Sequence, residues 1–233
     1  MAKSTLEVTR LEAFSDGVFA LSATLLVVSL EVPATVPELI TELPGFTSFA
    51  LSFGALVLIW SVHNAFFRRY ALQDRWTILL NACLLFVILF YVYPLKFLAR
   101  GFAQTFFGVA ATAGSTHLIR SVGELASLFV LYSMGFAVVF LCVALLYRHA
   151  FRRRLDLELT AAESWEALLY FRHYLIFALI GLLSALLAWQ GIGVRFGLPG
   201  WIYGLLGPLC YTHGVWSEKR QPAAGAVTGG SAR

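Results

Sequence analysis

Ionisable side chains interrupt the first long apolar run of the sequence. The run opens with Arg10, Glu12 and Asp16, and Asp16 lies about one and a half helical turns inside it. A charge within such a helix is costly unless it is paired or hydrogen-bonded. Arg10 and Asp16 are about 120° apart on a helix and do not pair along one face. We expect the Arg10 and Asp16 side chains each to reach a neighbouring helix. The alternative is that Arg10 and Glu12 lie at the membrane–water interface and that Asp16 caps a local group.

Polar side chains that suit this role occur in the next two apolar runs. The second run offers Trp60, His63 and Asn64, and the third offers Asn81. Asp16 and His63 are also residue types that form proton relays within membranes. A proton-coupled transporter that uses these two residues is therefore one candidate function. The five histidines are scattered, without the spacing of metal ligands or a catalytic triad. The sequence therefore predicts no enzyme, no metal site and no cofactor.

The second half of the first run has a regular stripe. Leu21, Thr24, Leu25 and Val28 follow the i, i+3, i+4, i+7 spacing of one helix face. Leu21 is about 140° from Asp16 around the helix, so the acid does not share this stripe. Periodicity alone leaves open whether the stripe faces lipid, a partner helix or a pore.

The composition indicates where these helices lie. Of 233 residues, 59% are hydrophobic and 13% charged, and the mean hydropathy is +0.78. Soluble domains average about 25% charged residues, so a soluble enzyme domain is disfavoured and a disordered chain is excluded. The net charge of +4 is better explained by membrane topology than by nucleic-acid binding. The three cysteines lie far apart in apolar runs and are interpreted as buried small hydrophobes.

Six stretches are long and apolar enough to span a bilayer, which takes about 20 residues each. The sixth is rich in glycine and proline, which are tolerated inside a helical bundle. We therefore predict an all-α integral membrane protein with one six-helix domain over residues 1–220 and a disordered tail over residues 221–233. The predicted spans are 11–30, 46–67, 76–98, 125–147, 168–189 and 196–216.

The basic residues predict the orientation of these spans, because cytoplasmic loops carry an excess of Lys and Arg. With the N-terminus in the cytoplasm, all but four of the seventeen basic residues fall on that side. Both termini are then cytoplasmic. The four exceptions are Lys96, Arg100, Arg120 and Arg195.

The start of the first helix resembles a known signature. Arg10-x-x-x-Phe14-Ser15-Asp16 is similar to the Arg-x-x-x-Phe-Ser-Asp motif of the lysosomal/endosomal potassium channel family and its bacterial relatives. The similarity is close over residues 9–30 and weaker at Trp60-x-x-His63 and at Asn81. The motif occurs once, so the chain resembles the six-helix bacterial subunit.

This resemblance implies a K⁺-permeable channel of the bacterial inner membrane, a homotetramer in lipid whose first helices line a central pore. Carried over residue by residue, the first pore ring is Leu21, the next is Thr24 or Leu25, and the third is Val28. Arg10, Phe14, Ser15 and Asp16 would tie the first helix to the second and third. The expected partners in those helices are Trp60, His63, Asn64 and Asn81.

Such a pore would use its rings as a gate. A narrow leucine ring blocks ions by excluding water, and Thr24 hydroxyls would replace part of the hydration shell of K⁺ once the ring is wet. Glu31, Glu38 and Glu42 would concentrate cations at the outer mouth, unless they are ordinary loop residues. We favour the interpretation that the Gly-bounded segment 101–114 is an outer linker. The alternative is that this segment forms a re-entrant pore loop.

Overall fold

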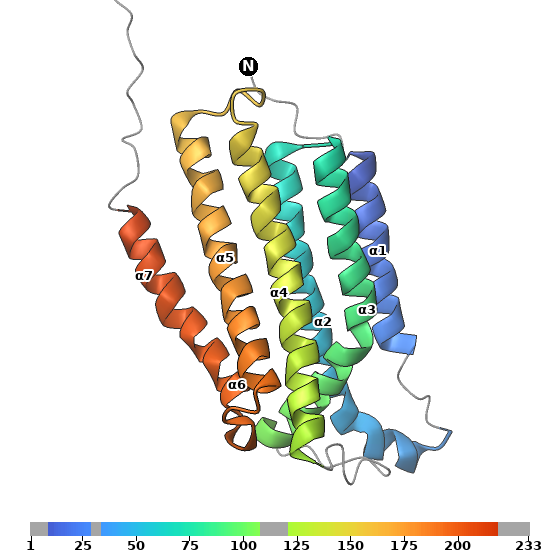
Figure 1. Cartoon of the computed structure of the whole chain (residues 1–233). Helices are drawn as coiled ribbons and strands as arrows, with labels where there is room; N and C mark the ends of the chain where they lie inside the picture. The colour runs from blue at the N-terminus through green and yellow to red at the C-terminus, as the bar shows by residue number, and fades with distance from the viewer. Residues whose placement is uncertain (1–8, 29–33, 108–120, 219–233) are drawn as a thin grey trace, which may run out of the picture.

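The computed structural model describes residues 9–28, 34–107 and 121–218, and every regular element in these ranges is helical (Figure 1). Five long helices are followed by a helical segment in short pieces. The long helices are α1 (Arg10–Val28), α2 (Val36–Tyr70), α3 (Arg75–Phe107), α4 (Val122–Arg152) and α5 (Ala161–Trp189). The short pieces are the 3₁₀ turn Val194–Phe196, α6 (Leu198–Trp201), the 3₁₀ turn Ile202–Leu205 and α7 (Leu206–Glu218).

Five described helices are long and apolar enough to cross a membrane, which confirms the first five predicted spans as helices. Several extend beyond the apolar run that predicted them: α4 begins at Val122 and ends at Arg152. α3 continues to Phe107, so the first half of segment 101–114 is helical. The described residues do not include the remainder of that segment, residue 31 or the predicted disordered tail.

The sixth predicted span is not one continuous α-helix. A helical run from Leu198 to Glu218 is interrupted by the 3₁₀ turn at residues 202–205, and α7 itself has 13 residues. The whole run has 21 residues and rises about 30 Å, but its hydrogen-bond pattern changes at the 3₁₀ turn. The separate 3₁₀ turn at Val194–Phe196, before this run, begins and ends at Gly193 and Gly197, which adopt left-handed backbone conformations.

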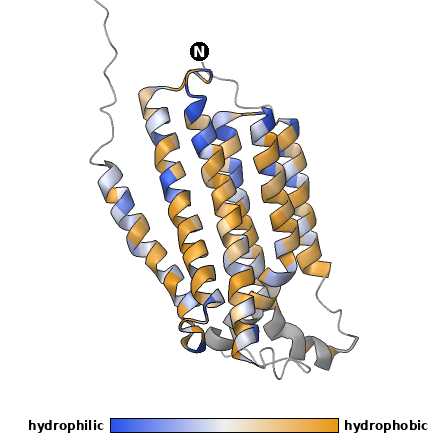
Figure 2. Ribbon diagram, viewed as in Figure 1, coloured by the Kyte–Doolittle hydropathy of each residue, from blue (hydrophilic) through white to orange (hydrophobic). Residues whose placement is uncertain are grey.

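The helices run alternately up and down, so the start of α1, the α2–α3 and α4–α5 connections and the end of α7 share one end of the bundle (Figure 1). We call this the loop end. Figure 2 shows that hydrophilic residues gather there while the helix shafts are apolar. The described arginines at this end include Arg68, Arg69, Arg75, Arg152, Arg153 and Arg154.

The α4–α5 pair packs through small residues. A Cβ atom at Gly181 would lie 3.0 Å from the Cβ of Ala137 and from the backbone oxygen of Ser133. The hydroxyl groups of Ser133 and Ser184 are 2.7 Å apart, and Ser184 donates to the carbonyl oxygen of Pro199 at 2.7 Å. These hydrogen bonds connect the interrupted sixth segment to α4 and α5.

Contrary to the prediction from the sequence, the cysteines on α3 and α4 are not both buried. Cys142 on α4 is buried, but Cys83 on α3 is exposed on the helix surface. The two thiol groups lie near enough in the fold to interact electrostatically. Their separation in sequence concealed this contact, because α3 and α4 bring them together only in the folded chain.

Candidate functional site

The first helix, α1, has two different faces. Its buried face comprises Ser15, Phe19, Ser22 and Leu26, and it packs against α2 and α3. The hydroxyl groups of Ser15 and Ser22 donate to the carbonyl oxygens of Leu11 and Val18, one turn back, at 2.8 and 2.9 Å. The two serines thus satisfy their own donors and leave their oxygens available as acceptors on the buried face.

A capping box begins α1. The side chain of Glu12 accepts from the backbone N–H of Thr9 at 2.8 Å, and Thr9 Oγ1 accepts from the backbone N–H of Glu12 at 3.2 Å. This reciprocal pair satisfies two backbone donors that a helix start leaves unpaired. The sequence-based interpretation of Glu12 as an interfacial charge missed this role. The Thr-x-x-Glu spacing was the signal that would have found it.

A chain of three buried polar groups connects α1, α2 and α3. His63 Nε2 and Asn81 Oδ1 are 2.8 Å apart, and Asn81 Nδ2 donates to Ser15 Oγ at 2.9 Å. Each of the three residues is at most 2% exposed. Because Asn81 donates through its nitrogen, its oxygen accepts, which assigns the Nε2 proton to His63. Every link in this chain then has one donor and one acceptor.

Asp16 has a separate partner. Its Oδ1 atom accepts from the indole N–H of Trp60 on α2 at 2.8 Å. This contact lies toward the surface of the subunit, whereas the chain from His63 to Ser15 is buried. The two residues of the alternative proton relay, Asp16 and His63, therefore bond to different groups. Phe19 covers His63, with ring centroids 5.4 Å apart.

Three of the predicted network residues lie elsewhere. Arg10 and Phe14 are exposed, Phe14 at 63%, and Asn64 is half-buried. Within the described ranges, the side chains of these three residues form no hydrogen bond or ion pair with another residue. Arg10 thus does not reach a neighbouring helix of its own subunit. It lies, with Phe14, on the face of α1 that points away from α2 and α3.

The predicted pore stripe lies on that same outward face. Leu21 is 51% exposed, Val28 is 71% exposed, and Thr24 is exposed between them, while Leu25 is half-buried against the core. At about 100° per residue, Arg10, Phe14, Leu21, Thr24 and Val28 fall within about 80° of one another. The subunit thus presents an unbroken outward stripe along α1.

Thr24 has a defined orientation on this stripe. Its hydroxyl group donates to the carbonyl oxygen of Ala20 at 2.9 Å. The proton is therefore directed toward the helix, and the exposed oxygen presents lone pairs outward. An oxygen in this state is a ligand for a cation rather than a donor to an anion.

Residues 10–91 match the family described as the endosomal/lysosomal potassium channel TMEM175. This range contains every residue of the buried polar chain and the outward stripe. A potassium channel of Marivirga tractuosa is 36% identical over 219 residues, which cover 91% of this chain and 88% of the relative.

Two further similarities extend the comparison. A potassium channel of Chamaesiphon minutus is 34% identical over 102 residues, which cover 40% of this chain and 50% of the relative. The crystal structure of a variant of the potassium channel MtTMEM175 superposes with a TM-score of 0.82 at 35% identity. That similarity covers 93% of this chain and 96% of the crystallised chain, so the fold is shared over nearly its whole length.

Proposed function

Because the chain belongs to the family of the endosomal/lysosomal potassium channel TMEM175, we propose that it is the subunit of a potassium-permeable cation channel. Conduction is passive, and the protein spans the bacterial inner membrane several times. The observation that carries the proposal is the outward stripe of α1, since it combines apolar residues with the hydroxyl oxygen of Thr24 on a face that the subunit leaves exposed. The permeant ion is K⁺, and no resident cofactor takes part.

Four copies of the chain form the pore in this proposal. One α1 helix cannot enclose a channel, and its exposed stripe in a single subunit is a face that further copies would cover. In a symmetric ring of four subunits, each residue of the stripe becomes a ring of four identical side chains. Leu21, Thr24 and Val28 then form successive rings along the axis, with Leu25 at the side of the pore helix.

The Leu21 ring is the hydrophobic gate. A narrow ring of leucines expels water, and a bare cation does not cross a dry apolar constriction. Conduction requires the ring to widen until it is wet. The Thr24 ring, whose oxygens point their lone pairs outward, then replaces part of the ion's hydration shell. Loss of hydration costs K⁺ less than Na⁺, which gives a preference for K⁺ without a carbonyl filter.

The buried polar chain positions α1. It fixes Ser15 against Asn81 and His63, and the Asp16–Trp60 bond adds a second contact. Arg10 and Phe14, on the outward face, are available to contact a neighbouring subunit or the inner mouth of the pore. The loop end of the bundle, with its arginines, is the cytoplasmic end, which places both termini in the cytoplasm.

A flux experiment tests the gate. The full chain is reconstituted into vesicles and K⁺ and Na⁺ fluxes are measured for Leu21→Ser. We expect at least a tenfold rise in flux with reduced preference for K⁺, because a barrier lower by about 1.4 kcal/mol suffices for that factor. The matched control is Val27→Ser, since Val27 is also 51% exposed but lies about 120° away around α1.

Three outcomes would count against the proposal. Unchanged flux and selectivity in Leu21→Ser would remove Leu21 as the gate. Flux that saturates and follows a pH gradient would favour the proton-coupled transporter that uses Asp16 and His63. A mass measurement of the protein in lipid discs that finds only single subunits would exclude the tetramer.

A further inference from the structure

A pocket at the loop end of the bundle lies apart from the outward stripe of α1. It has a volume of about 270 Å³ and is lined by two residues of α3 and four of α4. This volume is near the lower limit of about 300 Å³ for small-molecule sites, so it suits a headgroup rather than a large ligand. The lining residues are Trp76, Leu80, Leu145, Arg148, His149 and Arg152.

The charge of this pocket is positive. Arg148 and Arg152 are four residues apart in the last two turns of α4 and so lie on the same face of the helix. Neither forms an ion pair with an acidic residue in the described part of the chain. The guanidinium group of Arg148 lies 5.6 Å from the centre of the Phe171 ring, which supports one of its faces. The like charges of the two arginines repel each other, and an anion bound by both would remove that repulsion.

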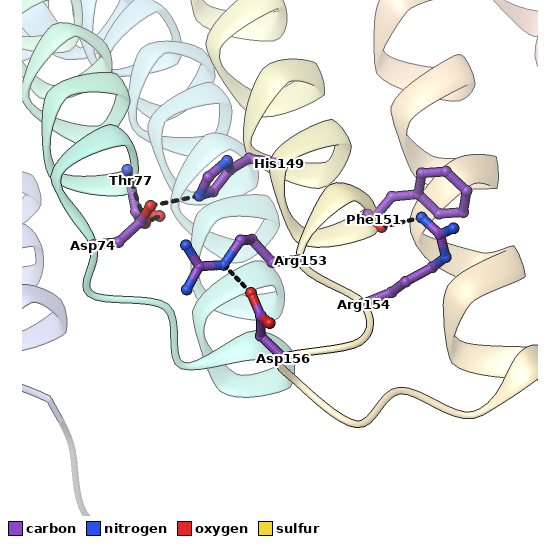
Figure 3. Close-up of polar contacts among 7 residues, drawn as sticks. All are labelled: Asp74, Thr77, His149, Phe151, Arg153, Arg154 and Asp156. Atoms are coloured by element: carbon purple, nitrogen blue, oxygen red, sulfur yellow. Dashed lines mark hydrogen bonds and ion pairs between the residues drawn. The ribbon is translucent and has the colours of Figure 1, made fainter.

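The nearest acidic group is already engaged. Asp74 Oδ2 contacts His149 Nε2 at 2.7 Å, and Asp74 Oδ1 accepts from the hydroxyl and backbone N–H groups of Thr77 (Figure 3). Partial burial alone would raise the pKa of the Asp74 carboxyl group, but the bonds from Thr77 and His149 outweigh it and lower that pKa. Asp74 thus holds His149 at the pocket wall. Arg148 and Arg152 form no ion pair with Asp74 and remain available to bind a ligand.

The next two arginines along the chain differ from this pair. Arg153 forms an ion pair with Asp156 at 2.7 Å, and Arg154 donates to the carbonyl oxygen of Phe151 at 3.2 Å (Figure 3). Neither lines the pocket. The loop end therefore contains two engaged arginines beside two that face a pocket, although all four lie within seven residues of sequence.

The other walls of the pocket are apolar. Leu80 and Leu145 lie deeper along the helices than the arginines, and Trp76, at the start of α3, is 64% exposed. Exposed tryptophan is typical of the membrane–water interface. Basic pockets between membrane helices on the cytoplasmic side bind anionic lipid headgroups. We propose that this pocket binds the phosphate headgroup of an anionic membrane phospholipid. Arg148 and Arg152 contact the phosphate oxygens, and Leu80 and Leu145 contact the start of an acyl chain.

A lipid-binding experiment tests this assignment without measuring ion flux, so its result is independent of the proposed function. The full chain is purified in a non-ionic detergent, stripped of lipid, and titrated with phosphatidylglycerol or phosphatidylcholine while bound lipid is counted by native mass spectrometry. We expect phosphatidylglycerol to bind more tightly than phosphatidylcholine. The double variant R148Q/R152Q should weaken phosphatidylglycerol binding roughly thirtyfold, since each basic side chain near the surface contributes about a fivefold factor.

The matched control is R153Q/R154Q, which removes the same charge from the same helix end but not from the pocket. We expect it to retain phosphatidylglycerol binding, and R148K/R152K should retain most of it. Equal binding by R148Q/R152Q and the wild type would overturn the proposal, as would equal loss in R153Q/R154Q. Displacement of the lipid by excess inorganic phosphate, with saturable binding of phosphate alone, would overturn the lipid as the source of the phosphate group. Unchanged elution of all variants in size-exclusion chromatography shows that lost binding is not lost folding.

Discussion

Two interfaces of this molecule hold helices together by different means. α1 is held to α2 and α3 by hydrogen bonds between side chains, from His63 through Asn81 to Ser15 and from Trp60 to Asp16. α4 and α5 meet mainly through packing: Gly181 lets their backbones approach closely, and aromatic rings such as Phe140 and Tyr174 stack across the interface beside the Ser133–Ser184 hydrogen bond. Both are known solutions for packing helices in lipid, where hydrophobic surface alone does not bring helices together.

The two interfaces fix their helices differently, although α1 and α5 both leave apolar residues exposed. Hydrogen bonds are directional, so a few of them set the rotation of α1 while its outward stripe remains exposed. Close packing of small residues needs a long continuous contact, which α4 and α5 provide. We infer that α4 and α5 form the support and that α1 is the element whose orientation carries function.

The largest expected effect comes from breaking the close-packed interface. Gly181→Val places atoms where Ala137 and the Ser133 backbone already lie, and overpacking of this kind costs up to about 3 kcal/mol. The midpoint of detergent-induced unfolding should fall accordingly. Gly54→Val is the control, because a Cβ at Gly54 meets nothing within 4 Å. If both variants unfold alike, α4–α5 packing is not the support.

A smaller loss is expected at the polar interface. Asn81→Ala leaves the buried N–H of His63 without its partner and removes the link to Ser15, which should cost about 2 kcal/mol. Asn64→Ala is the matched control, since Asn64 is half-buried on α2 and its side chain forms no polar contact within the described residues. Equal unfolding midpoints for the two variants would show that the buried chain does not hold α1.

The second contact of α1 should matter less than the first. Trp60→Phe removes the donor to Asp16 but keeps most of the ring. Trp60 is 36% exposed, whereas Asn81 is buried, so we expect a loss of about 1 kcal/mol or less. The same unfolding assay measures it, with Trp189→Phe as the control because Trp189 is 78% exposed. A loss larger than that of Asn81→Ala would reverse the ranking of the two contacts.

The smallest effect is expected outside both interfaces, at Asp74. Its pKa is lowered in the folded state, so the stability it contributes is present near neutral pH and is lost as the pH falls below about 4. Asp74→Asn should cost about 1 kcal/mol or less at pH 7, and the unfolding curves of variant and wild type should converge in acid. The control is Asp156→Asn, in a more exposed ion pair. Curves that stay parallel down to low pH would contradict this account.

Hydropathy predicted the five long spans because each helix carries its own apolar run. It did not predict where α4 and α5 begin, at Val122 and Ala161, since caps rather than apolar residues set these starts. Thr160 and Glu163 form a capping box at the start of α5, and Ser121 caps α4. Hydropathy also did not predict that the sixth segment is interrupted. Its glycines were interpreted as residues tolerated within a helix and not as residues that form a turn.

The candidate site shows the same limit. The sequence named Trp60, His63, Asn64 and Asn81 as possible partners of α1 but did not assign them. Asn64 follows His63 directly, so it is turned about 100° around α2 and lies away from the interface. Arg10 was expected to reach a helix of its own subunit, but the rotation of α1 directs it outward. Such assignments depend on how the packed helices rotate, which periodicity does not reveal.

The bond between Asn81 and Ser15 has a consequence for the angular setting of α1. A turn of α1 by one residue position, about 100°, would bring Ser22 or Ala20 to the place that Leu21 occupies. In the proposed pore, a hydroxymethyl or a methyl group would then replace an isobutyl group, and the proposed ring would become wettable or wider. The bond from Asn81 would thus determine, through the rotation of α1, which side chain lines that ring.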